Sequence, residues 1–265
     1  IVPYAQLPVF MATCVLTYLL GGRLFGEPIG RLAGVATAGF PTLANYPSYL
    51  LTESLATFLI VGSVGLIWMA WRQQRASWWA LAGVLLGLTS LCKAIMLWFM
   101  APVALALVAI PAPGAPWGRR LAHAAVVVGC CGLVVAPWLV RNHRLFGTPQ
   151  LSLRGELALW MRAQHLDDTP KDMAQAALYN FSEYLGHQVF PEAAARPEDV
   201  ILRVSHQANE RVHAFMAQGL TETEANHRVG REALRRLRTH PLRYALYTPI
   251  EAIKLTAFSY VPLLN

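Results

Sequence analysis

Charge is what this sequence has least of. Only 14% of its 265 residues are charged, while 55% are hydrophobic, and an ordinary soluble domain has roughly a quarter of its residues charged. The shortage lies in the first half, because residues 1–140 hold nine charged side chains and the remaining 125 residues hold the other 28. This composition excludes a single soluble domain and predicts a membrane region followed by a water-facing one.

Several chemical signatures are absent as well. The sequence contains no GxSxG nucleophile elbow, no P-loop and no Rossmann fingerprint. Its cysteines lie inside apolar runs without CxxC or Cys/His spacing, so we interpret them as small buried hydrophobes: Cys14, Cys92, Cys130 and Cys131. No matching halves are visible, which argues against a transporter built from repeats.

The net charge of +7 does not indicate a nucleic-acid partner. The positive residues lie mainly at the ends of apolar segments and on one late helix, where anionic lipid headgroups account for them better. We therefore expect membrane lipids as partners and no nucleic acid.

Long apolar runs dominate the first half. About 20 apolar residues cross the hydrocarbon core, and we expect about six spans and a further candidate that carries Glu251 and Lys254: 1–20, 32–50, 53–71, 77–92, 94–110, 121–140 and 242–264. The chain opens at Ile1 within an apolar run, so we expect it to be a fragment. The expected organisation is a transmembrane region at 1–145, an outward-facing helical domain at 146–240 and a return to the membrane at 241–265.

The loops give an orientation. On one side, GGRLFGEPIGR, WRQQR and WGRR carry two arginines each, whereas on the other FPTLANYPSYLLTE carries no base and SLCKA carries one. Positive residues favour the cytoplasmic side of short loops. Glu53, Lys93 and the stretch Arg141–Arg144 should therefore meet at one outward face, and ionisable residues at such depths suggest function.

The outward domain is predicted to be helical, with three or four amphipathic helices and no strand. Helix starts are predicted at Thr169–Asp172, at Arg196–Asp199, and at Thr221–Glu224, which has capping-box spacing. The last of these helices should end before Pro241. It carries Arg235, Arg236 and Arg238, which suit the helix dipole and an anionic membrane surface.

Two acidic or histidine clusters raise the question of a metal. His206, Glu210 and His213 share one helix face at i, i+4 and i+7, a spacing that a divalent ion can use. Without an HExxH motif or a fourth ligand, we favour a solvated helix face. The pair Asp167–Asp168 is interpreted as a loop cap. We therefore expect no metal site and no certain cofactor, although a divalent metal stays open as an alternative.

The order of several short elements resembles the bacterial membrane glycosyltransferases of the GT-C fold. Within that fold, the likeness is to the superfamily of protein O-mannosyltransferases and the lipid A aminoarabinose transferase. It is carried by these elements: Pro47 before Thr52-Glu53, Gly87-Leu88 before Lys93, Pro137-Trp138 with Arg141-Asn142, Phe146-Gly147, Gly155, and His240-Pro241.

The resemblance implies an all-α, polytopic transmembrane bundle with a helical periplasmic insertion, in the bacterial inner membrane. It implies transfer of a sugar from a polyprenyl-phosphate donor to an acceptor glycan, lipid or protein at the periplasmic face. The family's catalytic carboxylate lies in its first outward loop, which here would precede residue 1, so the expected catalytic Asp has no position in this sequence.

The candidate substrate-binding residues are Glu53, Lys93, Arg141, Asn142 and Arg144. A guanidinium grips two phosphate oxygens, so Arg141 and Lys93 are expected to hold the donor phosphate and Glu53 to align the acceptor. Each also has an ordinary interpretation: the arginines as snorkelling anchors, Lys93 as a solvated turn residue, and Glu53 as a structural ion-pair partner. The alternative function is a non-catalytic accessory or assembly subunit within a larger membrane complex.

Overall fold

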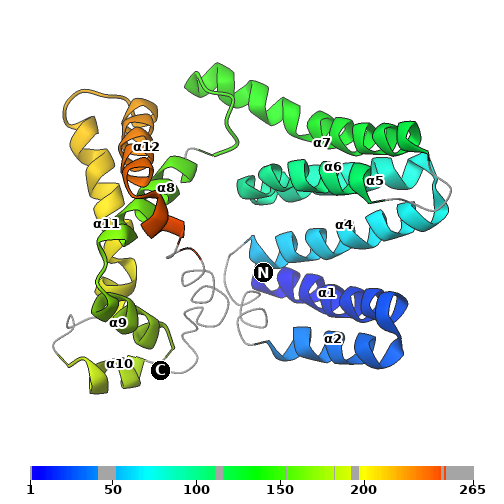
Figure 1. The fold of residues 1–265 in the computed structure, drawn as a ribbon, viewed down its shortest axis with the longest axis horizontal. Helices are drawn as coiled ribbons and strands as arrows, with labels where there is room; N and C mark the ends of the chain where they lie inside the picture. Colours follow the sequence, from blue (N-terminus) through cyan, green and yellow to red (C-terminus); the bar gives the residue numbers. More distant parts are fainter. Residues whose placement is uncertain are drawn as a thin grey trace. The chain divides into compact units, whose positions relative to one another are not determined.

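The computed structural model describes residues 2–40, 52–110, 116–152, 154–181, 183–191, 197–245 and 248 (Figure 1). All regular elements of these residues are helices, and no strand occurs among them. The predicted all-α fold class is therefore confirmed. The chain divides into two compact units, unit 1 at Ile1–Leu151 and unit 2 at Ser152–Asn265.

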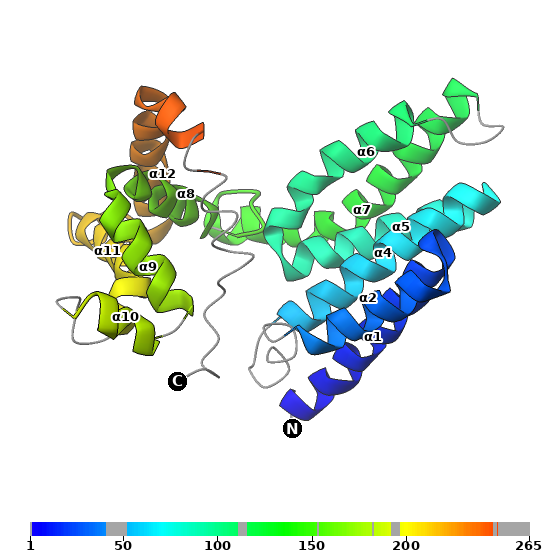
Figure 2. The same cartoon turned by 60° about the horizontal axis from the view of Figure 1, so that its bottom comes forward.

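Unit 1 is built from long apolar helices that lie side by side (Figure 2). In chain order its elements are α1 (Val2–Phe25), α2 (Glu27–Gly39), α4 (Glu53–Gln73), α5 (Ala76–Cys92), the 3₁₀ helix η2 (Ala94–Phe99), α6 (Met100–Ala109) and α7 (Trp117–Phe146). Large aliphatic side chains are exposed on this unit, among them Val35, Leu105 and Leu133. That surface suits hydrocarbon and is costly in water.

Among the described residues, three helices are long and apolar enough to cross a membrane: Gln6–Phe25 of α1, α4 and α7. They correspond to the predicted spans 1–20, 53–71 and 121–140, and they support a membrane location. The predicted spans 77–92 and 94–110 are shorter apolar helices. Of 32–50, the structure describes the end of α2, which starts earlier, at Glu27; of 242–264, it describes only 242–245 and 248. The total of about six spans stays a prediction.

Glycines set the distance between α1 and α2. The chain reverses at Gly26, whose φ of 95° is in the region that glycine adopts without strain. A side chain at Gly30 would overlap the backbone of Gly22 and the carbonyl oxygen of Tyr18. Close backbone approach at small residues is the usual basis of helix association in lipid.

Helices α5 and α7 also approach each other closely at glycines. A Cβ at Gly83 would overlap the carbonyl oxygen of Val127, and one at Gly87 would come within 2.7 Å of the Val134 Cβ. One turn earlier, the rings of Trp79 and His123 stack with centroids 4.9 Å apart. Because successive contacts ascend in both helices, α5 and α7 run parallel.

Unit 2 is a set of amphipathic helices. Its elements are α8 (Arg154–Gln164), the 3₁₀ turn η3 (His165–Asp167), α9 (Pro170–Phe181), α10 (Glu183–Val189), α11 (Pro197–Met216) and α12 (Glu222–Thr239). Its core combines residues of α8, α11 and α12: Trp160, Ala163, Ala208, Val212, Phe215, Ala225, Val229 and Ala233. Between residues 152 and 240 the described residues hold five α-helices, one more than the upper predicted number, and residues 241–245 are helical as well.

The predicted helix starts are found where the capping chemistry put them. Thr221 accepts a hydrogen bond from the Glu224 amide, and the Glu224 carboxylate accepts one from the Thr221 amide, so the capping box is complete. Thr169 and Asp172 make the same reciprocal pair before α9. α11 starts at Pro197, and α12 ends at Thr239, before Pro241.

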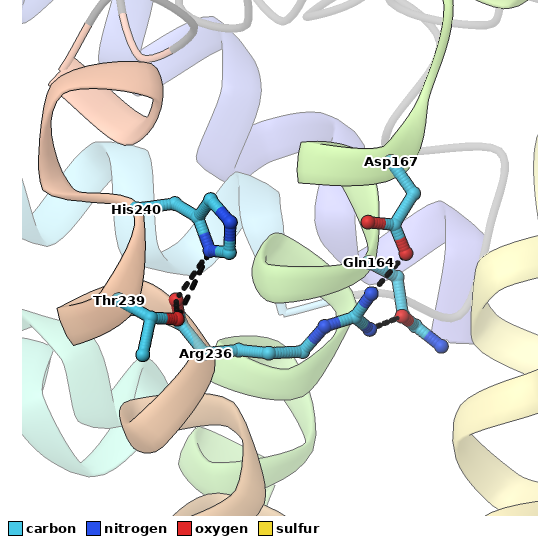
Figure 3. A network of polar contacts seen from close by, with 5 residues as sticks. All are labelled: Gln164, Asp167, Arg236, Thr239 and His240. Atoms are coloured by element: carbon cyan, nitrogen blue, oxygen red, sulfur yellow. Dashed lines mark hydrogen bonds and ion pairs between the residues drawn. The ribbon is translucent and has the colours of Figure 1, made fainter.

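One polar network ties α12 to α8 (Figure 3). The guanidinium of Arg236 donates to the Gln164 side-chain oxygen and pairs with the Asp167 carboxylate. Thr239 donates to the Arg236 carbonyl, 2.8 Å away, which closes the last turn of α12. Arg236 therefore turns towards the protein, unlike the exposed Arg235 and Arg238.

Candidate functional site

The candidate site starts with an ion pair between two helix ends. Glu53 is the first residue of α4, and Lys93 is the C-cap of α5, in an extended conformation that starts the turn into η2. The Lys93 ammonium donates to the Glu53 carboxylate across 40 residues of sequence. The two side chains are only 35% and 25% exposed, so the pair is held in a partly desolvated position.

The second carboxylate oxygen of Glu53 has no hydrogen-bond partner among the described residues. Glu53 Oε2 is buried and forms no hydrogen bond with any described residue, and the same holds for the Ser54 hydroxyl next to it. Buried polar atoms are nearly always satisfied, so an unpartnered pair of them at one helix start is unusual. The Glu53 oxygen is an acceptor, and the Ser54 hydroxyl can both donate and accept. Ser54 was not predicted, because an isolated serine at the start of an apolar run carries no sequence signal.

Arg141 lies one turn after Pro137, in the final turns of α7. Its guanidinium stacks 4.6 Å above the Trp138 ring and donates to the Asn142 side-chain oxygen at 3.0 Å. The residue is otherwise exposed. An exposed, pre-oriented guanidinium can bind two oxygens of a phosphate.

Asn142 is buried, and both ends of its side chain are occupied. Its Oδ1 accepts from Arg141, and its Nδ2 donates to the Gln150 carbonyl at 2.7 Å. These partners fix the orientation of the carboxamide, since the reverse orientation would face donor with donor. Asn142 thus positions Arg141, and the predicted contact of Asn142 with substrate stays a prediction.

Arg144 is exposed in the last turn of α7, which ends at Gly147 with a left-handed φ of 73°. A cation there is favoured by the helix dipole. Arg144 makes no hydrogen bond or ion pair with another described residue. It is thus available at the same helix end as Arg141.

The structure brings the predicted residues to one end of unit 1. Glu53 and Lys93 are in contact, and the parallel course of α5 and α7 carries Lys93 and Arg141 to the same end of the bundle. Arg141 makes no ion pair with Glu53, as far as the described residues go. A cavity shared by all of them stays a prediction.

The structure describes both groups of residues that the sequence raised as possible metal ligands. His206, Glu210 and His213 are exposed on α11, and the described residues contain no group of three metal-binding side chains close enough to hold an ion. Asp167 pairs with Arg236, and the buried Asp168 lies 2.6 Å from His165 Nδ1. Both acids are therefore engaged in contacts within unit 2.

Unit 1 defines the class of protein: a multi-pass helical membrane protein with an acid, a lysine and an arginine at one end. The model of the dolichyl-phosphate-mannose-protein mannosyltransferase family matches residues 4–140. The chain belongs to this family, and its membership supports a glycosyltransferase activity in general. Neither a curated protein nor a solved structure matches the chain.

Proposed function

We propose that the protein transfers a sugar from a polyprenyl-phosphate donor to an acceptor at the periplasmic face of the bacterial inner membrane, inverting the anomeric carbon. Family membership supports this, because the family is described by a lipid-phosphate-linked sugar as donor. The observation that carries the proposal is the half-buried Glu53–Lys93 pair at the same end of the bundle as Arg141.

The donor combines an apolar tail with an anionic phosphate, so it requires an apolar bundle with cations at one end. In the reaction, an acceptor oxygen or nitrogen attacks the anomeric carbon, and the bond from that carbon to the phosphate oxygen breaks. The bonding electrons leave with the phosphate, whose added negative charge must be stabilised. The acceptor's proton goes to a general base, for which the family resemblance implies a carboxylate.

Arg141 is assigned to the leaving phosphate. Its stacking on Trp138 and its bond to Asn142 hold the guanidinium in place before substrate arrives. Pre-oriented donors cost little reorganisation during the reaction. Lys93 offers the phosphate the N–H donors that its contact with Glu53 leaves over, and Arg144 attracts the headgroup from further along α7.

Glu53 is assigned to alignment. Lys93 occupies one of its carboxylate oxygens and leaves Oε2 as an acceptor for a substrate O–H or N–H. Because the contact with Lys93 holds the carboxylate in place, its role here is orientation and not proton transfer.

The test is a transfer assay on the full-length protein in nanodiscs, with undecaprenyl-phosphate-linked mannose and aminoarabinose as donors. We expect Arg141→Ala to reduce turnover about 100-fold, the usual effect of removing one charge-stabilising donor, and Arg141→Lys to restore part of it. Arg119→Ala is the matched control, since Arg119 is an exposed arginine in the first turns of the same helix. Normal turnover in Arg141→Ala would remove Arg141 from the site.

The same assay addresses the alternative function. A non-catalytic accessory subunit would show no transfer with any donor, and it would co-purify with a membrane partner in stoichiometric amounts. That combined result, from folded wild-type protein, would replace the enzyme proposal.

A further inference from the structure

Unit 2 contains a groove of about 600 Å³ along one face of α12. That volume is within the range of roughly 300–1,000 Å³ that small-ligand sites occupy. Arg228, Arg231 and Arg235 line it, at spacings of three and four residues that put them on one face of the helix. The predicted role of this helix, attraction to lipid headgroups in general, gave no reason to expect a concave site.

The acids of the groove are already engaged. Glu232 accepts two hydrogen bonds from the Arg211 guanidinium, at 3.0 and 3.2 Å. Glu224 is held by the amide and hydroxyl of Thr221, and these bonds lower the pKa of its carboxyl below the usual value. Both carboxylates therefore have partners other than the arginines of α12.

The arginines divide into one that is held and two that are not. The guanidinium of Arg228 lies 4.8 Å from the centroid of the buried Phe215 ring. The guanidinium of Arg211 lies 4.7 Å from the same centroid. Arg231 and Arg235 are exposed and make no hydrogen bond or ion pair with any described residue. The lining holds three arginines and two glutamates, so its net charge is positive. Net positive charge in a concave surface focuses the electrostatic field and attracts anions.

A histidine completes the wall of the groove. His227 Nδ1 lies 2.5 Å from the Glu156 carboxylate of α8, which fixes the ring. Since Nδ1 is engaged, Nε2 is the ring nitrogen that remains for a ligand. A fixed ring beside a fixed guanidinium, Arg228, makes this end of the groove rigid.

From these contacts we propose that the α12 groove is a second anion site, separate from the residues assigned to sugar transfer, and that it binds a phosphomonoester or diphosphate group. Arg231 and Arg235 are four residues apart, about 6 Å along the helix axis, so their guanidinium groups grip adjacent phosphate oxygens in forked pairs. Arg228 and His227 border the bound group.

The experiment measures binding, not turnover, so its result is independent of the transfer assay. Full-length protein in phosphatidylcholine nanodiscs is titrated calorimetrically with inorganic pyrophosphate and, in parallel, with dihexanoyl phosphatidic acid. We expect R231Q/R235Q to weaken binding at least tenfold. R238Q, an exposed arginine of α12 outside the groove, should change the Kd less than twofold.

The two probes distinguish the source of the phosphate. If R231Q/R235Q weakens the binding of both probes, the site recognises the phosphate group alone. If it weakens only the binding of phosphatidic acid, the natural ligand is a lipid headgroup. If it weakens only the binding of pyrophosphate, the natural ligand is a free phosphate. The proposal is overturned if neither probe binds, or if R231Q/R235Q binds like the wild type while its thermal unfolding is unchanged. Equal losses in R231Q/R235Q and R238Q would also overturn it, since general charge would then explain the binding.

Discussion

The two units hold their helices together in different ways. In unit 1, backbones approach at glycines, as between Gly83 and Val127, and the outward side chains are apolar. In unit 2, an alanine- and valine-rich stripe of α12 is buried, while the outer faces carry ion pairs and the helix starts carry caps. The difference follows from the solvent: lipid gives no hydrophobic drive between helices, so packing at small residues takes over, whereas water drives apolar faces together.

The largest expected effect tests packing in unit 1. Gly83→Ala puts a methyl group on the Val127 carbonyl oxygen and should destabilise the bundle by about 3 kcal/mol, the upper part of the range for overpacking. Gly129→Ala is the control, because nothing lies within 4 Å of a Cβ there. Thermal unfolding in detergent compares the two, and equal melting temperatures would contradict close packing of α5 on α7.

The next effect compares one ion pair from each unit. A double-mutant cycle on Glu53→Gln and Lys93→Met should give a coupling of about 1–2 kcal/mol, between the values typical of exposed and buried pairs. The same cycle on the more exposed pair Arg211–Glu232 should give less than about 1 kcal/mol and decrease with salt. Chemical denaturation at two salt concentrations measures both. A coupling between Glu53 and Lys93 that is weaker than the coupling between Arg211 and Glu232 would contradict this prediction.

A smaller effect tests the helix caps of unit 2. Thr169→Ala removes the acceptor for the Asp172 amide and should cost about 1 kcal/mol. Hydrogen exchange of the first-turn amides of α9 measures the loss locally. In Thr169→Ser, which keeps the hydroxyl, the first-turn amides should exchange at the wild-type rate. If they also exchange at the wild-type rate in Thr169→Ala, the cap does not contribute to stability.

The smallest effect is on pH dependence. Hydrogen bonds from Thr221 lower the pKa of Glu224 below its ordinary 4.5. The start of α12 is therefore fully stabilised above that pH and loses this contribution as the pH falls through the lowered pKa. In Glu224→Gln, the exchange rate of the first-turn amides should no longer change across this interval. If the exchange rate still changes with pH in Glu224→Gln, a group other than Glu224 causes the pH dependence.

The sequence was informative where a pattern is local. The helix starts at Thr169 and Thr221 are marked by four-residue patterns, and the chemistry of these patterns places a helix start without reference to the rest of the fold. The positive-inside argument also grouped Glu53 with Lys93, because alternating spans bring alternate loops to one face. The all-α class follows from the same patterns.

Contacts between distant segments could not be predicted in this way. The pairing of Glu156 with His227 and that of Asp167 with Arg236 span 71 and 69 residues, and many other partners were equally compatible with the composition. The close approach at Gly83 was missed because a glycine in an apolar span has the same sequence pattern whether it faces lipid or a neighbouring helix. Ser54 and the double engagement of Asn142 became visible only with the packed side chains.

The carboxamide of Asn142 links two things that are otherwise separate. It is a planar, rigid group, so its bond to the Gln150 carbonyl and its bond from Arg141 rotate together. This one amide therefore sets the direction of the Arg141 guanidinium relative to the backbone at Gln150, where the chain has left α7.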